Sequence, residues 1–246
     1  MSLEKQIPIW LSKYLKKNNL NTFVIGVSGG IDSAVVSTLC AMTGYDTKLV
    51  LMPIHQNVDE TNRGLNHCEF LKNKFDNVEV IISDLTDIYE NFSSKVLTKF
   101  KNKLSLANTR ARIRMTMLYM IAGGSNGIVV GTGNKVEDFG VGFFTKYGDG
   151  GVDISPIANL MKSEVYTLAK KLQINQEIID ALPTDGLWDD GRSDEDQLGV
   201  TYDDLEWAMN YKSGELDEEL SHVIQVYKKH RKQNLHKMIK IPVFKK

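Results

Sequence analysis

A glycine-rich turn between an apolar run and a helical pattern constrains the fold of this chain most strongly. Residues 23–27 form a short, β-prone apolar run that ends in Ser28-Gly29-Gly30, and residues 33–42 then read as a helix closed by Gly44. Glycines permit positive φ and a close approach of the backbone to a ligand, so such a turn and the helix N-terminus after it can hold an anion. The sequence therefore predicts a strand, an anion-binding turn and a helix.

Strand and helix patterns continue to alternate after this unit. Apolar runs at residues 47–53, 78–82 and 127–131 predict strands, and the segments 59–74, 86–100 and 104–122 predict helices. Strands that alternate with helices imply a parallel sheet covered on both faces. We expect a doubly wound, Rossmann-like α/β fold with about five parallel strands.

The chain changes character after residue 132. It is glycine-rich and loop-like up to residue 151, which is longer than an idle connection in a compact domain and predicts a functional segment. Further on, residues 162–172, 202–210 and 216–232 have helical patterns, and residues 185–199 predict an exposed flexible loop. Thr201 and Asp204 have the spacing of a capping box, with Asp in place of the usual Glu or Gln.

Composition excludes several classes of protein. A formal net charge of -1 argues against a general nucleic-acid binder, and no run of about 18 apolar residues suggests a membrane span. Cys40 and Cys68 lack a CxxC partner, which predicts neither a disulfide framework nor a zinc site and fits a reducing cytoplasm. We expect residues 1–246 to form one domain.

Charge is unevenly distributed near the C-terminus. Residues 185–219 hold thirteen carboxylates, whereas residues 228–246 hold eight Lys or Arg and no acid. One explanation is a solvated acidic face followed by a solvated basic tail. The alternative is that the basic tail contacts phosphates.

The glycine turn lacks the Lys of GxxxxGK[ST] and does not spell GxGxxG, so it is neither a Walker A loop nor a dinucleotide fingerprint. An acid within a phosphate loop fits a Mg²⁺ ligand, and a glycine turn with an Asp cap is the alternative. The sequence of this turn, Ser28-Gly29-Gly30-Ile31-Asp32-Ser33, resembles the SGGxDS loop of the N-type ATP pyrophosphatases, whose fold is adenine nucleotide alpha hydrolase-like. Those enzymes cleave ATP between its α- and β-phosphates and adenylate a carbonyl or carboxylate oxygen. The resemblance implies ATP contacts along the whole turn, from Gly26, Val27, Ser28, Gly29, Gly30, Ile31, Asp32 and Ser33.

Further segments resemble one family within that group, the ammonia-dependent NAD synthetases. The resemblance runs from about residue 24 to residue 242. It is carried in order by Asn108-Thr-Arg110-Ala-Arg112-Ile-Arg114-Met115, Gly131-Thr132-Gly-Asn134-Lys135-Val-Glu137, Phe144-Thr-Lys146-Tyr-Gly-Asp149-Gly-Gly, Asp153-x-x-Pro156 with Lys162 downstream, Pro183-Thr184 and His236-Lys237.

The family resemblance implies a role for each matching residue. It assigns ATP to Thr132, Lys162 and Thr184, Mg²⁺ to Asp32 and Glu137, and the substrate deamido-NAD to Arg112, Lys146, Asp153, His236 and Lys237. Asp149 is expected to take a proton from ammonium and to be catalytic together with Asp32 and Lys162.

Without the resemblance, these residues have ordinary explanations as surface arginines, a solvated loop acid, a surface turn and a basic tail. Arg112 and Arg114 lie two apart on a predicted helix and so point to different faces, which leaves a structural role for Arg114.

The expected activity is a C–N bond-forming ligation. The nicotinate carboxylate of deamido-NAD attacks the α-phosphorus of ATP, pyrophosphate leaves, and ammonia then displaces AMP to give NAD, the last step of NAD biosynthesis. Glutamine-dependent relatives carry an additional nitrilase-like glutaminase domain, which this chain is too short to hold, so free ammonia is the expected nitrogen source. The resemblance also implies a homodimer, to which the apolar helix 104–122 would contribute.

Two other functions remain open. One is another N-type ATP pyrophosphatase that modifies tRNA or transfers sulfur, although Cys40 lies among apolar helix residues and the net charge is near zero. The other is a non-catalytic nucleotide-binding regulator.

The chain departs from the family pattern at two places. Many relatives have Arg before Leu-Pro at an adenine contact, where this chain has Leu51-Met52-Pro53, and six residues separate Glu137 from Phe144 where five are usual.

Overall fold

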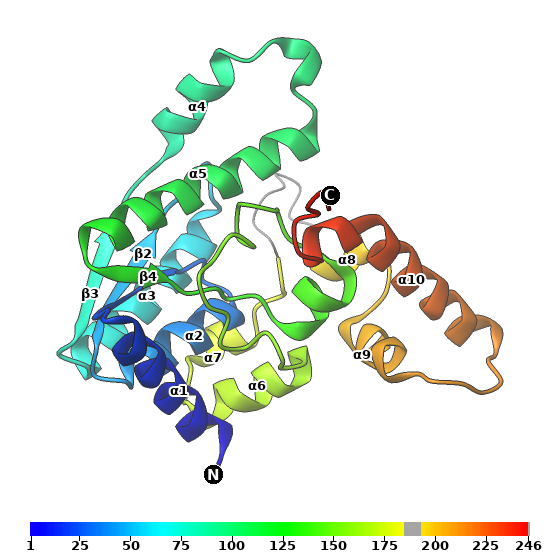
Figure 1. Cartoon of the computed structure of the whole chain (residues 1–246), viewed down its shortest axis with the longest axis horizontal. Helices are drawn as coiled ribbons and strands as arrows, with labels where there is room; N and C mark the ends of the chain where they lie inside the picture. The colour runs from blue at the N-terminus through cyan, green and yellow to red at the C-terminus, as the bar shows by residue number, and fades with distance from the viewer. Residues whose placement is uncertain (185–192, 246) are drawn as a thin grey trace.

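A parallel sheet forms the centre of the molecule (Figure 1). The computed structural model describes residues 1–184 and 193–245. Its strands lie in the order β3-β2-β1-β4, and every neighbouring pair is parallel. The chain thus moves outward from β1 to β3 and then returns to the other side of β1, which confirms the doubly wound α/β fold. The strands are β1 Thr22–Gly26, β2 Asp46–Leu51, β3 Val78–Ile82 and β4 Gly127–Val129.

The described residues form four strands where the sequence predicts about five. Next to β4 the fifth position is reduced to one isolated parallel bridge between Val130 and Ile154. Two residues later Pro156 has no N–H to donate, so the ladder does not continue as a regular strand.

Helices cover both faces of the sheet, as the alternating pattern predicts. Successive residues of β1 point to opposite faces: Phe23 and Ile25 belong to a core with α1, α2, α3 and α6, and Val24 to a core with α4 and α5. The helices are α1 Leu3–Asn18, α2 Ile31–Ala41, α3 Val58–Lys74, α4 Thr86–Ser94, α5 Lys103–Gly124, α6 Lys162–Lys171, α7 Gln176–Ile179, α8 Asp194–Leu198, α9 Tyr202–Asn210 and α10 Glu218–Met238.

Some predicted elements differ from those in the structure. The helix predicted at 86–100 divides into α4 and a 3-10 turn, Thr98–Phe100. The loop predicted after residue 132 contains a π-helix, Lys135–Val141. The flexible loop predicted at 185–199 contains α8, and residues 185–192 lie outside the described residues. The predicted capping box of Thr201 and Asp204 is confirmed at the start of α9.

The helices α9 and α10 lie on the other side of the molecule from β3 and pack against the π-helix (Figure 1). Gly142, which ends the π-helix at φ 69°, makes this approach possible, because a Cβ there would lie 2.5 Å from Cβ of Asn234. Asn234 Nδ2 donates to the carbonyl of Val141 at 2.9 Å. In the part of the chain that the structure describes, no helix is long and apolar enough to cross a membrane.

Candidate active site

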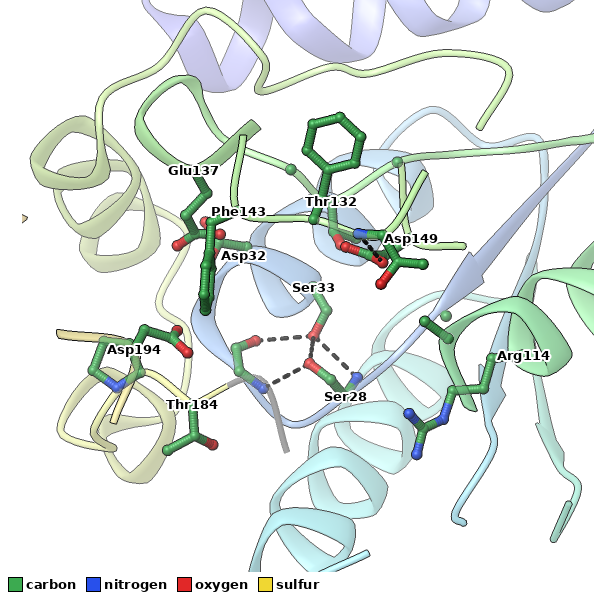
Figure 2. A pocket seen from close by; sticks show the side chains of 18 of the residues that line it. Ser28, Asp32, Ser33, Arg114, Thr132, Glu137, Phe143, Asp149, Thr184 and Asp194 are labelled. Carbon is green, nitrogen blue, oxygen red and sulfur yellow. Dashed lines mark hydrogen bonds between the residues drawn. The ribbon is translucent and has the colours of Figure 1, made fainter. Parts of the chain in front are cut away.

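One large cavity opens where the sheet strands end. It has a volume of about 880 Å³ and is lined by residues that follow β1, β2 and β4, together with residues from α5, α6 and α10. Because β1 lies between β2 and β4, the chain reverses its direction of winding at this point, which is where open α/β sheets bind ligands. Figure 2 shows Asp32, Glu137, Thr184 and Asp194 toward one end and Arg114 toward the other.

The floor of the cavity is the turn between β1 and α2. Ser33 Oγ donates to the carbonyl of Gly30 at 2.9 Å, and Ser28 Oγ accepts from the N–H of Gly30 at 3.2 Å (Figure 2). Among the described residues, no side chain caps the N-terminus of α2, whose N-cap residue is Gly30. This geometry suits the anion site that the sequence predicts, since the first N–H groups of a helix have no partner within the helix.

Gly29 gives the turn its shape. It has φ +90°, and a Cβ at this position would lie 2.3 Å from the carbonyl oxygen of Glu60 in α3. The N–H of Gly64 lies 3.1 Å from the same point. The positive φ and the close contact with α3 together allow only glycine at this position.

A buried lysine and two partly buried carboxylates form a charge cluster beside the turn. Lys162 Nζ donates to Asp32 Oδ2 at 2.6 Å and to Glu137 Oε1 at 2.9 Å, and the lysine is only 3% exposed. Burial opposes the charge on Lys162, but the two carboxylates outweigh it and raise the pKa of the ammonium. Burial likewise opposes the charge on Glu137, where Lys162 prevails and lowers the pKa, whereas at Asp32 burial prevails and raises it. One ammonium faces two carboxylates, so the cluster has an excess of negative charge.

Two further residues hold this cluster, and the sequence analysis missed their roles. Asn134 is fully buried, and its Nδ2 donates to Asp32 Oδ1 at 3.2 Å. The hydroxyl of Tyr202 donates to Glu137 Oε1 at 2.7 Å, and burial followed by the charge of Glu137 raises the pKa of this phenol, which stays protonated. Asn134 stands within the Gly131–Glu137 motif and before a helical segment, which was a usable signal. Tyr202 has no local signal, because 65 residues separate it from Glu137.

Asp149 is open to the cavity, and its Oδ1 accepts from the N–H of Thr145 at 3.0 Å. Loss of hydration in the cavity wall raises the pKa of Asp149 to about 6, and Glu137 adds to the shift, while backbone N–H groups and Lys237 oppose it. A carboxyl with a pKa near neutrality is suited to exchange a proton at physiological pH. Nearby Asp138, which the sequence analysis did not select, has its pKa raised well above the usual range by burial and then by Asp149.

The two arginines of α5 point to different places, as their spacing predicts. Arg112 is exposed, and its Nε donates to the carbonyl of Lys146 at 3.2 Å. Arg114 donates from Nε to the carbonyl of Met52 at 2.9 Å and from Nη2 to Gln56 Oε1 at 2.7 Å. Burial, followed by the neighbouring Arg110, lowers the pKa of Arg114 to about 10. Arg114 therefore has the structural bonds expected of it and also lines the cavity.

The C-terminal helix supplies the wall opposite the turn. Lys237 Nζ donates to the carbonyl of Phe144 at 2.6 Å, and Lys146 Nζ donates to the carbonyl of His236 at 2.9 Å. These reciprocal bonds tie the end of α10 to the loop after the π-helix. Lys237 of the basic tail thus has a specific partner in the protein, and the contact of the tail with phosphates stays a prediction.

The cavity brings together nearly every residue selected from the sequence. It is lined by the turn from Gly26 to Ser33 and by Arg112, Thr132, Glu137, Lys146, Asp149, Lys162, Thr184, His236 and Lys237. Asp153 is the exception, since it is not among the lining residues. Its Oδ1 accepts from the hydroxyl of Tyr119 at 2.9 Å and its Oδ2 from the N–H of Val129 at 2.8 Å.

A sequence model of a known family matches this chain. The family is described as NAD synthase, and the match covers residues 3–246. Among individual relatives, an NH(3)-dependent NAD(+) synthetase from Carboxydothermus hydrogenoformans is 37% identical over 201 residues, which is 80% of each chain.

Two solved structures resemble the whole chain. An NMN synthetase from Francisella tularensis superposes with a TM-score of 0.88 and 33% identity, covering 99% of this chain and 97% of that one. An NH3-dependent NAD synthetase from Campylobacter jejuni, in complex with the nitrate ion, has a TM-score of 0.78 and 28% identity with the same coverage.

Proposed function

The chain belongs to the NAD synthase family, and we propose that it is an ammonia-dependent ligase that converts deamido-NAD to NAD at the expense of ATP. One observation carries this proposal. A single cavity joins an anion-binding turn, a buried Asp32–Lys162–Glu137 cluster and a carboxyl of near-neutral pKa, Asp149. Adenylation followed by amidation needs these three parts together.

The reaction has two chemical steps. An oxygen of the nicotinate carboxylate bonds to the α-phosphorus of ATP, and the bond from that phosphorus to the bridging oxygen breaks, so pyrophosphate leaves. Ammonia then bonds to the carboxyl carbon, the C–O bond to AMP breaks, and NAD and AMP are released. Two anionic substrates must meet, so the protein's task is to position them and to neutralise their charge.

ATP is assigned to the β1–α2 side of the cavity. The N–H groups at the N-terminus of α2 would receive its phosphates, and Lys162 and Thr184 line the same space. Thr184 Oγ1 donates to Glu60 Oε1 at 2.7 Å, so it belongs to the α3 wall that also fixes Gly29. Thr132 follows the end of β4 and faces ATP from the other side of β1.

Asp32 and Glu137 fit a Mg²⁺ ion. Both are partly buried carboxylates that line the cavity and offer hard oxygen donors. The described residues contain no group of three or more His, Cys, Asp and Glu that could hold a metal ion. Mg²⁺ is typically held by one or two carboxylates together with substrate phosphates. When bound, it would neutralise the charge of the leaving pyrophosphate.

Asp149 is proposed to take the proton that ammonium must lose before it can attack. Arg112, Lys146, Asp153, His236 and Lys237 are proposed to bind deamido-NAD. Four of the five line the cavity, so they can meet a ligand directly. Asp153 lies outside the cavity. Within one chain, Asp153 would affect the bound ligand only through Tyr119, whose hydroxyl donates to it.

We further propose a cytoplasmic homodimer in which residues 1–246 form one synthetase domain. Support comes from several exposed apolar side chains on α4, the segment after it and α5, and α4 projects from the body of the molecule (Figure 1). Such a surface favours association with a second copy. It comprises Ile88, Phe92, Leu97, Phe100, Leu104 and Met120.

A second substrate has a specific observation in its favour. The NMN synthetase structure superposes on this chain with a TM-score of 0.88, against 0.78 for the NAD synthetase structure. The same chemistry on nicotinate mononucleotide would give nicotinamide mononucleotide. Both acceptors present the same carboxylate, so the site described above serves either reaction.

A competition experiment distinguishes the two acceptors. The purified protein is given ATP, Mg²⁺ and ammonium with deamido-NAD, with nicotinate mononucleotide, or with both, and the amidated products are separated and quantified. A higher kcat/KM for deamido-NAD supports the first assignment, and a higher value for the mononucleotide supports the second. If neither acceptor gives an amidated product together with pyrophosphate, both assignments are refuted.

A further inference from the structure

The ammonium of Lys162 occupies the oxygens that a metal would need. It bonds one oxygen of Asp32 at 2.6 Å and one of Glu137 at 2.9 Å. Its side chain is 4% exposed, and those of the two carboxylates are 17% and 16% exposed. Figure 2 shows Asp32 and Glu137 next to one another at the same end of the cavity.

The position of this ammonium is built by its surroundings. Tyr202 lies with its ring centroid 4.9 Å from Nζ, so the face of an aromatic ring meets the cation while its hydroxyl holds Glu137. Asn134 holds the second oxygen of Asp32. Lys162 is also the first residue of α6, where the backbone of the helix fixes its Cα. These contacts define a cation site between the carboxylates, and the protein's own lysine fills it.

A metal ion and this ammonium would compete for the site. The ammonium already uses Oδ2 of Asp32 and Oε1 of Glu137, and a second cation on the same two carboxylates would be repelled by it in this poorly solvated place. The described residues offer the metal no third His, Cys, Asp or Glu in a group. The triphosphate of ATP can favour the metal over the ammonium at these carboxylates, because it supplies oxygen ligands to the metal and a new anionic partner to Lys162.

We propose that Lys162 holds the place of the metal in the nucleotide-free protein and leaves it only when a triphosphate binds. The protein then takes up Mg²⁺ together with the nucleotide and binds the ion poorly alone. Lys162 can move because its flexible stem carries the ammonium, and it lines the same cavity as the phosphate-binding turn. This inference rests on the assignment of ATP and metal in the proposed function, and it does not depend on which acceptor is amidated.

The test measures metal binding without nucleotide, acceptor or turnover. Mn²⁺ is titrated into the full-length protein, and free Mn²⁺ is followed by electron paramagnetic resonance. Wild type is expected to bind weakly, and Lys162→Met to bind at least tenfold more tightly, because the competing cation is gone. Lys171→Met is the matched control, since it makes the same change at the exposed end of α6, and it should resemble wild type. The double variant Glu137→Gln/Lys162→Met should lose the gain.

Two outcomes would overturn the inference. One is a Lys162→Met protein that folds and binds Mn²⁺ no better than wild type. The other is tight binding of Mn²⁺ to nucleotide-free wild type that disappears in Glu137→Gln, since the lysine would then not exclude the metal. The comparison of wild type with Glu137→Gln needs no change at Lys162, so it tests the inference even if Lys162→Met does not fold.

Thermal melting provides an independent readout on wild type. Millimolar Mg²⁺ alone should leave the melting temperature unchanged, whereas Mg²⁺ with an ATP analogue that cannot be cleaved between its α- and β-phosphates should raise it. A rise with Mg²⁺ alone that is lost in Glu137→Gln would contradict the inference. Failure of the proposed function would instead appear as absent amidation with metal binding as described.

Discussion

The substitution Tyr202→Phe removes one oxygen atom and tests whether Glu137 must be held in place. The hydroxyl donates to Glu137 Oε1 at 2.7 Å and lies 3.3 Å from Asp194 Oδ2. The ring belongs to the apolar core that also contains Val136 and Leu205, and phenylalanine preserves that packing. The ring face toward Lys162 is preserved as well. The change therefore removes only the hydroxyl and its contacts with Glu137 and Asp194.

The magnitude follows from the burial of this bond. A hydrogen bond to a charged group contributes about 1.5–3 kcal/mol, and residues that orient metal ligands typically account for about 10- to 100-fold in metal affinity or activity. We expect the Mg²⁺ concentration for half-maximal rate to rise within that range, with a smaller change in the acceptor KM. The loss of stability should lower the melting temperature by about 3–12 °C for a chain of this size.

The assay compares Tyr202→Phe with Tyr211→Phe, which removes a hydroxyl bonded to the exposed carbonyl of Gly214 just beyond the same helix. Initial rates are measured across a Mg²⁺ series at saturating ATP, and melting curves are recorded for both variants. The reasoning is refuted if Tyr202→Phe melts lower but shows an unchanged Mg²⁺ dependence and kcat, because Tyr202 would then be only structural.

Three further outcomes follow from single residues. Asp149→Asn should lower kcat by about 10²- to 10⁴-fold. In wild type the fall in rate at acid pH should have its midpoint at the pKa of the Asp149 carboxyl, about 6. The variant should lose this fall in rate, and a variant that keeps it would show that another group takes the proton. Burial lowers the pKa of His67 to about 4, so the unfolded chain binds the proton more tightly, and the free energy of unfolding should fall by up to about 3 kcal/mol as pH drops from 6.5 toward 4. Denaturant titrations at several pH values check this, and His67→Gln should show the smaller dependence. Lys237→Met breaks the bond to Phe144 and should raise the acceptor KM about tenfold or more while sparing the ATP KM; equal changes in both would argue for a general loss of structure.

The sheet and its glycine turn were predictable because their signals are local. Apolar runs of strand length, and glycines at the end of one of them, fix where β1 ends and where α2 begins. The N-terminal helix α1 was not predicted, although Ile7, Leu11 and Leu15 recur at helical spacing and all three are buried in its core. In that case the pattern was present in the sequence.

The segment after β4 shows what spacing can indicate and what it cannot. Six residues between Glu137 and Phe144, where relatives have five, predict a displaced loop start. The structure accommodates this stretch in a π-helix, which closes at Gly142 with a hydrogen bond from its N–H to the carbonyl of Glu137 five residues earlier. A wider turn of this kind takes up an added residue within a helix and is frequent at functional sites.

Contacts between distant segments were beyond the sequence. Nothing near Tyr202 points to Glu137, and nothing near Arg114 points to the carbonyl of Met52. The family pattern predicts Arg where this chain has Leu51, and the guanidinium at this strand end comes from Arg114 of α5. Only the folded sheet brings these segments together.

The central claim is that one carboxylate oxygen of the acceptor becomes bonded to the α-phosphorus of ATP. Deamido-NAD labelled with ¹⁸O in its nicotinate carboxylate is converted with ATP, Mg²⁺ and ammonium, and AMP and pyrophosphate are isolated and analysed by mass spectrometry. One ¹⁸O is expected in each AMP and none in pyrophosphate. Label in pyrophosphate or inorganic phosphate, or unlabelled AMP formed together with amidated product, would contradict it.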